Sequence, residues 1–395
     1  MSVRRVIAVF GLLALVLSGC DGPAAPSGAG STSAAAPALR PDWQPLALPA
    51  PPGGAGRLLV RDATSCAGRW FLVGGVADSS GGTRPAAWTS VDGTTWTVVT
   101  VRPDSFYGRQ NVFLSVACRD GAAALVGAKV GGAHGYPRIS TWRQVTDGAL
   151  VEVQAPFETF GGPTAVNVSR LTAGPQGWLI VGNRSAGAAS WVSSPDAAEF
   201  ALVEGAPELA SDAVGVTWAF DAVATSSGWL AVGGLLPAGR IDRDPAVWSS
   251  PDGRSWRRTV LPGGSEYEEL QRVALVGGVP VAVGLRGSTF GAWRQEAGGW
   301  VAAGTFGRRA GAGVPGVASL VTSGDRLFAA VTDGARQSVW VSTDRGGSWR
   351  EVAIPLGVPA GVDRDVSLVA VGDRCWLAAD DGARPGLWWA AGVGV

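Results

Sequence analysis

The sequence of 395 residues is poor in several reactive side chains, with one histidine, one lysine, one methionine and three tyrosines. Because His134 is the only histidine, a two-histidine metal site is excluded, and a Ser-His-Asp triad would have to use that residue. Charged residues make up 16% of the chain, and 32 basic and 32 acidic side chains cancel. Such a chain lacks the electrostatic signature of nucleic-acid binding. We expect no nucleic acid partner, no metal and no cofactor.

Long helices are also disfavoured, because 59 glycines and 25 prolines would interrupt them. Hydrophobic residues nevertheless make up 46% of the chain, which is enough for a large core. We therefore expect a folded chain with short elements and many turns.

The first twenty residues have the pattern of a bacterial signal peptide. Arg4 and Arg5 precede an apolar run over residues 6–17, too short to stay in a membrane as a spanning helix. The string Leu-Ser-Gly-Cys that ends at Cys20 resembles a lipobox, which implies that residues 1–19 are removed and Cys20 is lipidated. An ordinary secretory signal is the alternative, and export by the general or the twin-arginine route stays open.

Residues 20–40, rich in Ala, Ser and Pro, then form a flexible linker, and residues 41–395 form the folded domain. We expect a protein held at a bacterial cell membrane by its lipid anchor and facing outside the cytoplasm.

A tryptophan recurs along the folded part at intervals of 45 to 57 residues. An apolar segment precedes each of these anchors, and a second aromatic residue follows most of them. Each repeat therefore predicts four short strands. Such units cannot bury both faces alone, so neighbours must stack, and a closed ring removes most free sheet edges. The anchors are Trp88, Trp142, Trp191, Trp248, Trp293, Trp340 and Trp388.

The seventh repeat ends without a fourth strand, and residues 43–49 resemble the fourth strands predicted at 256–262 and 349–355. We predict an all-β, seven-bladed β-propeller of four-stranded antiparallel blades, with the N-terminal strand completing the last blade. Six blades and two half-domains are the alternatives.

Three turns between third and fourth strands carry Ser and Asp before a Trp, at Asp92, Asp252 and Asp344. The Asp carboxylate can accept hydrogen bonds from its own turn, and Gly there can take a positive φ, so we expect a structural role. The string over 342–349, Ser-Thr-Asp-Arg-Gly-Gly-Ser-Trp, resembles a full Asp box. The chain thus resembles the BNR/Asp-box propellers, a superfamily that includes sialidases, other glycoside hydrolases, sortilin-type receptors and photosystem assembly factors.

Sialidases of this superfamily carry a Phe/Tyr-Arg-Ile-Pro motif, three arginines at the channel mouth, and a tyrosine nucleophile paired with a carboxylate. Residues 136–140, Tyr-Pro-Arg-Ile-Ser, have neither that order nor the final proline. Tyr267 lies between Glu266 and Glu268, but adjacent strand residues point to opposite faces. We therefore expect no sialidase activity, while a carboxylate-pair glycosidase stays open.

Every repeat has an arginine shortly before its anchor tryptophan, in the predicted loop between second and third strands. A ring of guanidinium groups there would suit carboxylate, phosphate or sulfate ligands. The alternative is structural, with each arginine paired to an acid of the next blade or stacked on a tryptophan. Tyr107, Arg109 and Tyr267 join the same face through loops between blades. The arginines are Arg84, Arg138, Arg184, Arg243, Arg286, Arg336 and Arg384.

Three cysteines besides Cys20 are too far apart in sequence for a Cys-x-x-Cys motif. Cys66 and Cys118 fall in first-to-second strand turns of neighbouring blades, so we favour a disulfide between them, with Cys375 free. A Cys66–Cys375 pair across the ring closure is the alternative.

These patterns favour a monomeric, non-enzymatic binding or scaffold propeller for an envelope protein or an anionic glycan. The alternative is a sialidase-like glycoside hydrolase of the Asp-box superfamily. A convergent carboxylate pair in the central channel would favour the enzyme, and a broad charged face without a deep cleft would favour the binder. A third hypothesis is a module that assists assembly of a neighbouring membrane complex.

Overall fold

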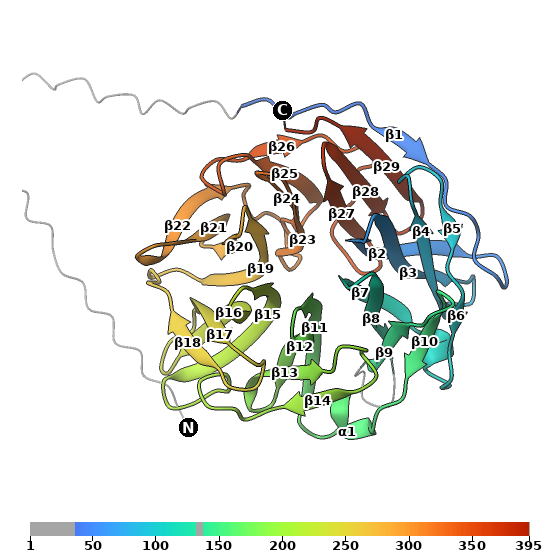
Figure 1. The fold of residues 1–395 in the computed structure, drawn as a ribbon. Coiled ribbons are helices and arrows are strands. Elements are labelled where there is room, and N and C mark those ends of the chain that lie inside the picture. Colours follow the sequence, from blue (N-terminus) through green and yellow to red (C-terminus); the bar gives the residue numbers. More distant parts are fainter. Residues whose placement is uncertain (1–35, 132–136, 395) are drawn as a thin grey trace, which may run out of the picture. The chain divides into compact units, whose positions relative to one another are not determined.

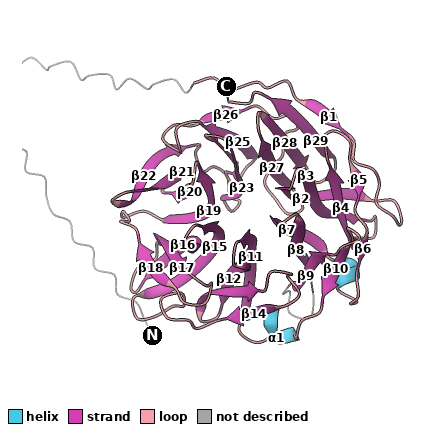
Figure 2. Cartoon of the chain, in the orientation of Figure 1, coloured by secondary structure: helices cyan, strands magenta, loops and turns pink. Residues whose placement is uncertain are grey.

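A computed structural model describes residues 36–131 and 137–394. Residues from Pro37 onward form one compact unit, so the unit begins four positions before residue 41. Seven sheets form the blades of a β-propeller around a central axis (Figure 1), which confirms the predicted fold class. Helix in the described chain is limited to α1 (Phe157–Phe160) and one 3-10 turn (Gly108–Gln110), both near blade 2 (Figure 2). Cys20, His134 and Tyr136 lie outside the described residues.

Each blade runs from an innermost strand, beside the central axis, to an outer strand at the edge of the propeller. The innermost strands of blades 1 to 7 are β2 (Arg57–Cys66), β7 (Val112–Arg119), β11 (Ala165–Gly174), β15 (Gly215–Thr225), β19 (Glu268–Val276), β23 (Gly316–Ser323) and β27 (Asp365–Val371). The second strands are β3 (Arg69–Ala77), β8 (Ala122–Lys129), β12 (Gly177–Arg184), β16 (Gly228–Pro237), β20 (Val279–Arg286), β24 (Arg326–Thr332) and β28 (Arg374–Asp380).

The third strands carry the anchor tryptophans. They are β4 (Thr83–Ser90), β9 (Arg138–Gln144), β13 (Gly187–Ser193), β17 (Asp244–Ser250), β21 (Thr289–Glu296), β25 (Gln337–Ser342) and β29 (Pro385–Ala391). The outer strands are β5 (Thr97–Val98), β10 (Leu150–Val153), β14 (Phe200–Val203), β18 (Arg257–Val260), β22 (Gly299–Phe306), β26 (Arg350–Val352) and, in blade 7, β1 (Gln44–Leu46). Blade 2 gains a fifth strand, because β6 (Val101–Arg102) pairs in parallel with β10.

The ring closes through the N-terminal strand, as predicted. β1 pairs antiparallel with β29, so the two ends of the described chain share one sheet (Figure 1). Just before β1, Leu39 pairs in parallel with Val352 of blade 6, and the Trp43 indole donates to the carbonyl of Ala353 at 2.8 Å. The segment from Leu39 to β1 therefore holds blades 6 and 7 together.

The anchor tryptophans explain why the repeat persists in the sequence. In blades 1 to 4 the anchor is fully buried, and its indole N–H donates a hydrogen bond to the segment that arrives from the preceding blade. Each anchor thus fixes the path of the chain between blades as well as filling the core. The four acceptors are the Pro49 carbonyl, the Asn111 side chain, the Thr159 carbonyl and the Glu208 carbonyl, at 2.5 to 3.2 Å.

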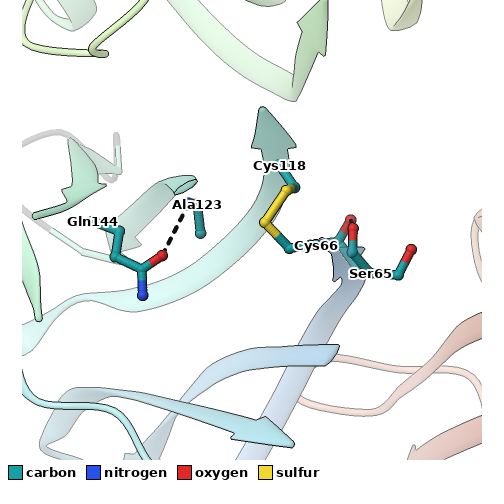
Figure 3. The surroundings of a disulfide bond; sticks show 6 residues. Ser65, Cys66, Cys118, Ala123 and Gln144 are labelled. Carbon is teal, nitrogen blue, oxygen red and sulfur yellow. Dashed lines mark hydrogen bonds between the residues drawn. A yellow bond between two sulfur atoms is a disulfide. The ribbon is translucent and has the colours of Figure 1, made fainter. Parts of the chain in front are cut away.

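A disulfide joins Cys66, at the end of β2, to Cys118 in β7, and so links blades 1 and 2 (Figure 3). This is the pair that the sequence favours. Cys375 is buried in blade 7 with a free thiol, and burial raises the pKa of that thiol to about 12. A thiol of this kind stays protonated and unreactive at neutral pH.

Candidate functional site

Strand direction alternates within each blade, so two kinds of connection meet at one end of the propeller. These are the second-to-third strand loops and the connections between blades, and we call this end the loop face. The other end, the turn face, carries the first-to-second and third-to-fourth connections. All seven repeat arginines lie on the loop face, either at the ends of strands or in the loops between them.

Three of these arginines are held by carboxylates close to the body of the protein. Arg184 is 4% exposed and pairs with Glu204 at 2.9 Å, with further bonds to Thr164 and to a backbone carbonyl. Arg243 pairs with Glu269 of the next blade at 2.8 Å, and Arg286 with a glutamate of its own blade at 2.9 Å. Their positive charges are therefore already compensated within the chain.

Three more arginines lie at the rim and make weaker contacts. Arg84 donates to two backbone carbonyls of the segment that leaves β1, Arg336 pairs with Glu351 at 3.0 Å, and Arg384 pairs with Asp381 at 3.2 Å. Arg336 and Arg384 are well exposed, so water screens these pairs. Only Arg243 among the six follows the next-blade pairing considered from the sequence. Whether the ring binds anions stays a prediction.

Arg138 differs from the other six. Its guanidinium lies over the rings of Tyr107 and Phe157, at 5.5 and 5.1 Å from their centroids. Within the described residues it has no ion pair and no hydrogen bond, and its Nε is buried. Arg109, the neighbouring cation, is exposed and donates to the Asp104 carbonyl at 3.1 Å.

Arg138 lines two adjoining recesses between blades 2 and 3, which together we call the blade 2–3 groove. The first has a cavity volume of about 330 Å³ and apolar walls that include Ile139, Phe160 and Val168. The second, of about 390 Å³, is more polar and contains Ser140 and Glu152. The groove combines an unpaired cation with an apolar wall, which is the usual composition of a small-ligand site.

Glu152 is the acidic side chain that lines this groove, and it is fully occupied. It accepts hydrogen bonds from the Asp104 and Ser105 amides and from the hydroxyls of Ser105 and Ser140, at 2.7 to 2.9 Å. Burial alone would raise its pKa, but these hydrogen bonds hold the pKa of Glu152 below its usual range. The carboxylate therefore stays ionised and holds the loop that precedes β7, rather than acting as an acid or base.

Tyr267 makes a contact that the sequence argument missed. Its hydroxyl donates to Glu269 at 2.6 Å, and the same carboxylate accepts from Arg243 and from Gln271. Burial and the negative charge of Glu269 raise the pKa of Tyr267. The sequence argument weighed only Glu266 and Glu268, which are adjacent to Tyr267. Glu269 stands two positions after Tyr267, and residues at that spacing lie on the same side of a strand.

The innermost strands carry charged side chains of both signs. Six innermost strands have a β-bulge at an equivalent position. The residues that resume pairing after these bulges are Asp62, Ser115, Arg170, Asp221, Arg272 and Ser319.

Two of these side chains accept hydrogen bonds from the next blade. The Asp62 carboxylate accepts from the Val116 amide at 2.9 Å, and the Asp221 carboxylate accepts from the Val273 amide at 3.1 Å. Arg170 lies between these carboxylates, 3.1 Å from Asp62 and 4.0 Å from Asp221. Both acids are therefore used for bonding between blades, and a guanidinium contacts both.

Two further groups of the innermost strands, Asp365 and Arg272, have shifted protonation equilibria. Burial raises the pKa of Asp365, at the start of β27, to about 6, and burial lowers the pKa of Arg272 to about 10. Neither has an ion pair within 4.0 Å among the described residues. Among all residues that the structure describes, no group of three or more His, Cys, Asp or Glu side chains is arranged to hold a metal ion.

The three predicted turn aspartates lie on the turn face. Asp92 accepts from the amides of Thr94 and Thr95 at 2.7 and 2.6 Å, and Asp252 and Asp344 make equivalent bonds within their own turns. Gly93 has φ of +73° and lies against Trp376 of blade 7, so a side chain there would collide with that ring. These turns lie at the end of the propeller opposite the loop face, and each packs against the neighbouring blade.

No protein-family model matches the chain, and no curated protein matches it in sequence. Among solved structures, a GH74 enzyme of Niastella koreensis is 13% identical, with a TM-score of 0.50 over 88% of this chain and 55% of that one. A Lactobacillus plantarum protein is 13% identical, with a TM-score of 0.48 over 80% and 94%. A Trypanosoma rangeli sialidase is 12% identical, with a TM-score of 0.43 over 86% and 56%. This chain spans about half the length of the GH74 enzyme and the sialidase, and the likeness is one of fold.

Proposed function

We propose that this chain is a binding or scaffold β-propeller that takes an envelope protein or an anionic glycan on its loop face. The observation that carries the proposal is where apolar side chains are exposed. Of thirteen large apolar side chains exposed in the described chain, eight lie in connections of this face, Phe157 in α1 among them, and one, Val91, lies in a turn of the opposite face. The eight are Phe106, Tyr107, Val130, Phe157, Val214, Ile241, Val314 and Val362.

The exposed aromatic residues gather beside the blade 2–3 groove. Phe106 is 65% exposed, Phe157 is 57% exposed and Tyr107 is 39% exposed, and Arg109 and Arg138 lie next to them. Aromatic and arginine side chains contribute most of the binding energy at protein interfaces, and aromatic rings also stack on sugar rings. Exposed apolar groups gathered on one face favour contact with a partner.

The paired carboxylates of the innermost strands favour binding over catalysis. Glycosidases need two carboxylates that face the substrate, one of them as a protonated acid. Here Arg170 contacts both Asp62 and Asp221, and both carboxylates also accept backbone hydrogen bonds. We therefore regard this protein as a non-enzymatic, monomeric module, and we assign the turn aspartates Asp92, Asp252 and Asp344 to Asp-box turns.

A glycoside hydrolase is the second candidate, and one contact favours it. The Tyr267 hydroxyl donates to Glu269 at 2.6 Å beside Arg243, so a carboxylate is in place to accept the phenolic proton. Release of a chromogenic aglycone from aryl glycosides, sialosides included, tests this candidate. Turnover that is lost in Tyr267→Phe would establish the enzyme, and absence of turnover across the panel would exclude it for those substrates.

The binding proposal is tested by capture on a glycan array and from an envelope extract. The probe is the full chain with Cys20→Ser, compared with a Phe106→Ser/Phe157→Ser variant and a matched Val91→Ser control on the turn face. We expect the double variant to lose capture of the same ligand that wild type and control retain. Equal capture by all three proteins would contradict a binding role for the loop face.

Anchoring through Cys20 is a separate part of the proposal and has its own test. The lipobox resemblance predicts that the chain incorporates a labelled fatty acid in a bacterial host and sediments with membranes. No helix of the described residues is long and apolar enough to cross a membrane. Cys20→Ser should abolish the label and release the protein from the membrane fraction, and a labelled or membrane-bound variant would contradict the anchor.

A further inference from the structure

We infer that the blade 2–3 groove binds a carboxylate group carried on an apolar body about the size of a phenyl ring, with Arg138 as the counter-ion. The inference rests on the proposed binding role of the loop face and names a ligand chemistry for one site on it. The shared chemistry has two sources, a free aryl or alkyl acid and the C-terminal end of a polypeptide whose last residue is apolar.

The first step is the unpaired cation. Seven arginines lie at or near the second-to-third strand connections, and six have a carboxylate or backbone carbonyl as a partner. Arg138 has neither among the described residues, and its Nε is buried without an acceptor. No acceptor of the described chain contacts the terminal guanidinium nitrogens either, so an acceptor that reaches them gains the strength of a charge-assisted hydrogen bond.

The second step is the orientation of that cation. The Tyr107 and Phe157 rings lie against the guanidinium at 5.5 and 5.1 Å. Cation–π contacts of this kind hold the guanidinium in place without giving its N–H groups an oxygen acceptor, so these groups stay available as donors. A planar carboxylate is the group that two such N–H donors match best.

The third step is the local charge. Glu152 lines the polar recess, but its four hydrogen-bond donors come from Asp104, Ser105 and Ser140, and it lies beyond ion-pair distance of Arg138. The guanidinium charge is therefore not neutralised by the wall of the groove. An anion is complementary to it, and a cationic ligand is not.

The fourth step is the apolar recess on the other side of Arg138. Its cavity volume is about 330 Å³, and its walls include Ile139, Phe160, Val166 and Val168. A space of this size accepts a phenyl ring or a short alkyl chain, and such walls give that group little beyond apolar contact. Arg138 borders both recesses, so one ligand can place its carboxylate on the guanidinium and its body in the apolar recess.

The test uses the full chain with Cys20→Ser and four probes in calorimetric titration. These are 3-phenylpropionate, its uncharged amide, a pentapeptide ending in a free phenylalanine carboxylate, and the same peptide amidated. We expect at least one acid to bind, and its amide to bind about tenfold or more weakly. The free acid and the peptide distinguish the two sources of the ligand.

The decisive variant is Arg138→Gln, and the matched control is Arg336→Gln at the equivalent position of blade 6. We expect Arg138→Gln to weaken the acid about tenfold or more while leaving binding of the amide unchanged, and the control to behave as wild type. Thermal unfolding of both variants shows that the fold is retained. Should Arg138→Gln fail to fold, Ile139→Asp, which places a negative charge on the apolar wall, should weaken the acid by a similar factor.

Equal binding of acid and amide, or full binding of the acid by Arg138→Gln, would overturn the inference, as would no binding of any probe. Failure of the proposed function has a different signature. If the groove binds no carboxylate but the loop face binds a partner, Arg138→Gln keeps the glycan or envelope capture that Phe106→Ser/Phe157→Ser loses. If the loop face binds no partner, the Phe106→Ser/Phe157→Ser variant captures as well as wild type.

Discussion

Removing the segment that closes the ring should destabilise the whole propeller. A chain that begins at residue 49 loses the pairing of β1 with β29, the backbone bonds of Leu39 to blade 6 at 2.8 Å, and the indole bond of Trp43 at 2.8 Å. It also exposes the apolar surface covered by Leu39, Trp43, Leu46 and Leu48, which pack partly buried against blades 6, 7 and 1.

Four half-buried apolar side chains at about 1 kcal/mol each, with a few net hydrogen bonds, amount to a loss of about 4–6 kcal/mol. This is a large part of the total stability of a typical domain, roughly 5–15 kcal/mol. Urea unfolding followed by tryptophan fluorescence measures the loss, with a chain that begins at residue 37 as the control. That control should unfold as the full chain does, and a loss below about 1 kcal/mol in the shorter chain would refute the closure role of β1.

Three further outcomes follow from the same structure. Cys66→Ser with Cys118→Ser should lower the free energy of unfolding by about 4 kcal/mol, because the disulfide closes a loop of 52 residues; no loss in urea unfolding without reductant would contradict this. Burial raises the pKa of Asp365 to about 6, so its ionised form costs stability as the pH rises from about 4 through 6. Asp365→Asn should therefore raise the urea midpoint at pH 7.5 but not at pH 4, and an unchanged midpoint at both would contradict the shift. Arg184→Met should cost about 2–3 kcal/mol and Arg336→Met less than about 0.5 in thermal unfolding, because only the first guanidinium is buried; equal losses would show that burial does not distinguish them.

The blades were predictable because the repeat is set by packing that the sequence records directly. A second strand covered on both sides must be apolar over most of its length, as β12 is from Trp178 to Val181, and a tryptophan at a fixed place in the third strand fills the space between blades. The closing strand was predictable for the same reason, since Trp43 stands before β1 as Trp256 stands before β18. The intervals between these tryptophans therefore carried the blade count.

The partners of the polar side chains were not predictable, because they depend on how neighbouring blades face each other. Arg184 and Arg138 both precede their anchor tryptophans by a few residues, yet one ends a second strand and is buried on Glu204, and the other begins a third strand and lies over two aromatic rings. The β-bulge that precedes Arg170 in β11 leaves no mark on the apolar pattern. The sequence did hold a signal for Glu269, because it stands two positions after Tyr267, and residues at that spacing lie on the same side of a strand.

Site-specific photo-crosslinking in living bacteria tests the binding face most directly. A photoreactive residue is placed at Phe157 or Ile241 on the loop face, or at Val91 on the turn face, all three well exposed. The account predicts that Phe157 yields a specific crosslinked species to an envelope protein or glycan, and that Val91 does not. Crosslinks of equal yield from both faces, or none from Phe157 and Ile241, would contradict the claim that this propeller works by binding through its loop face.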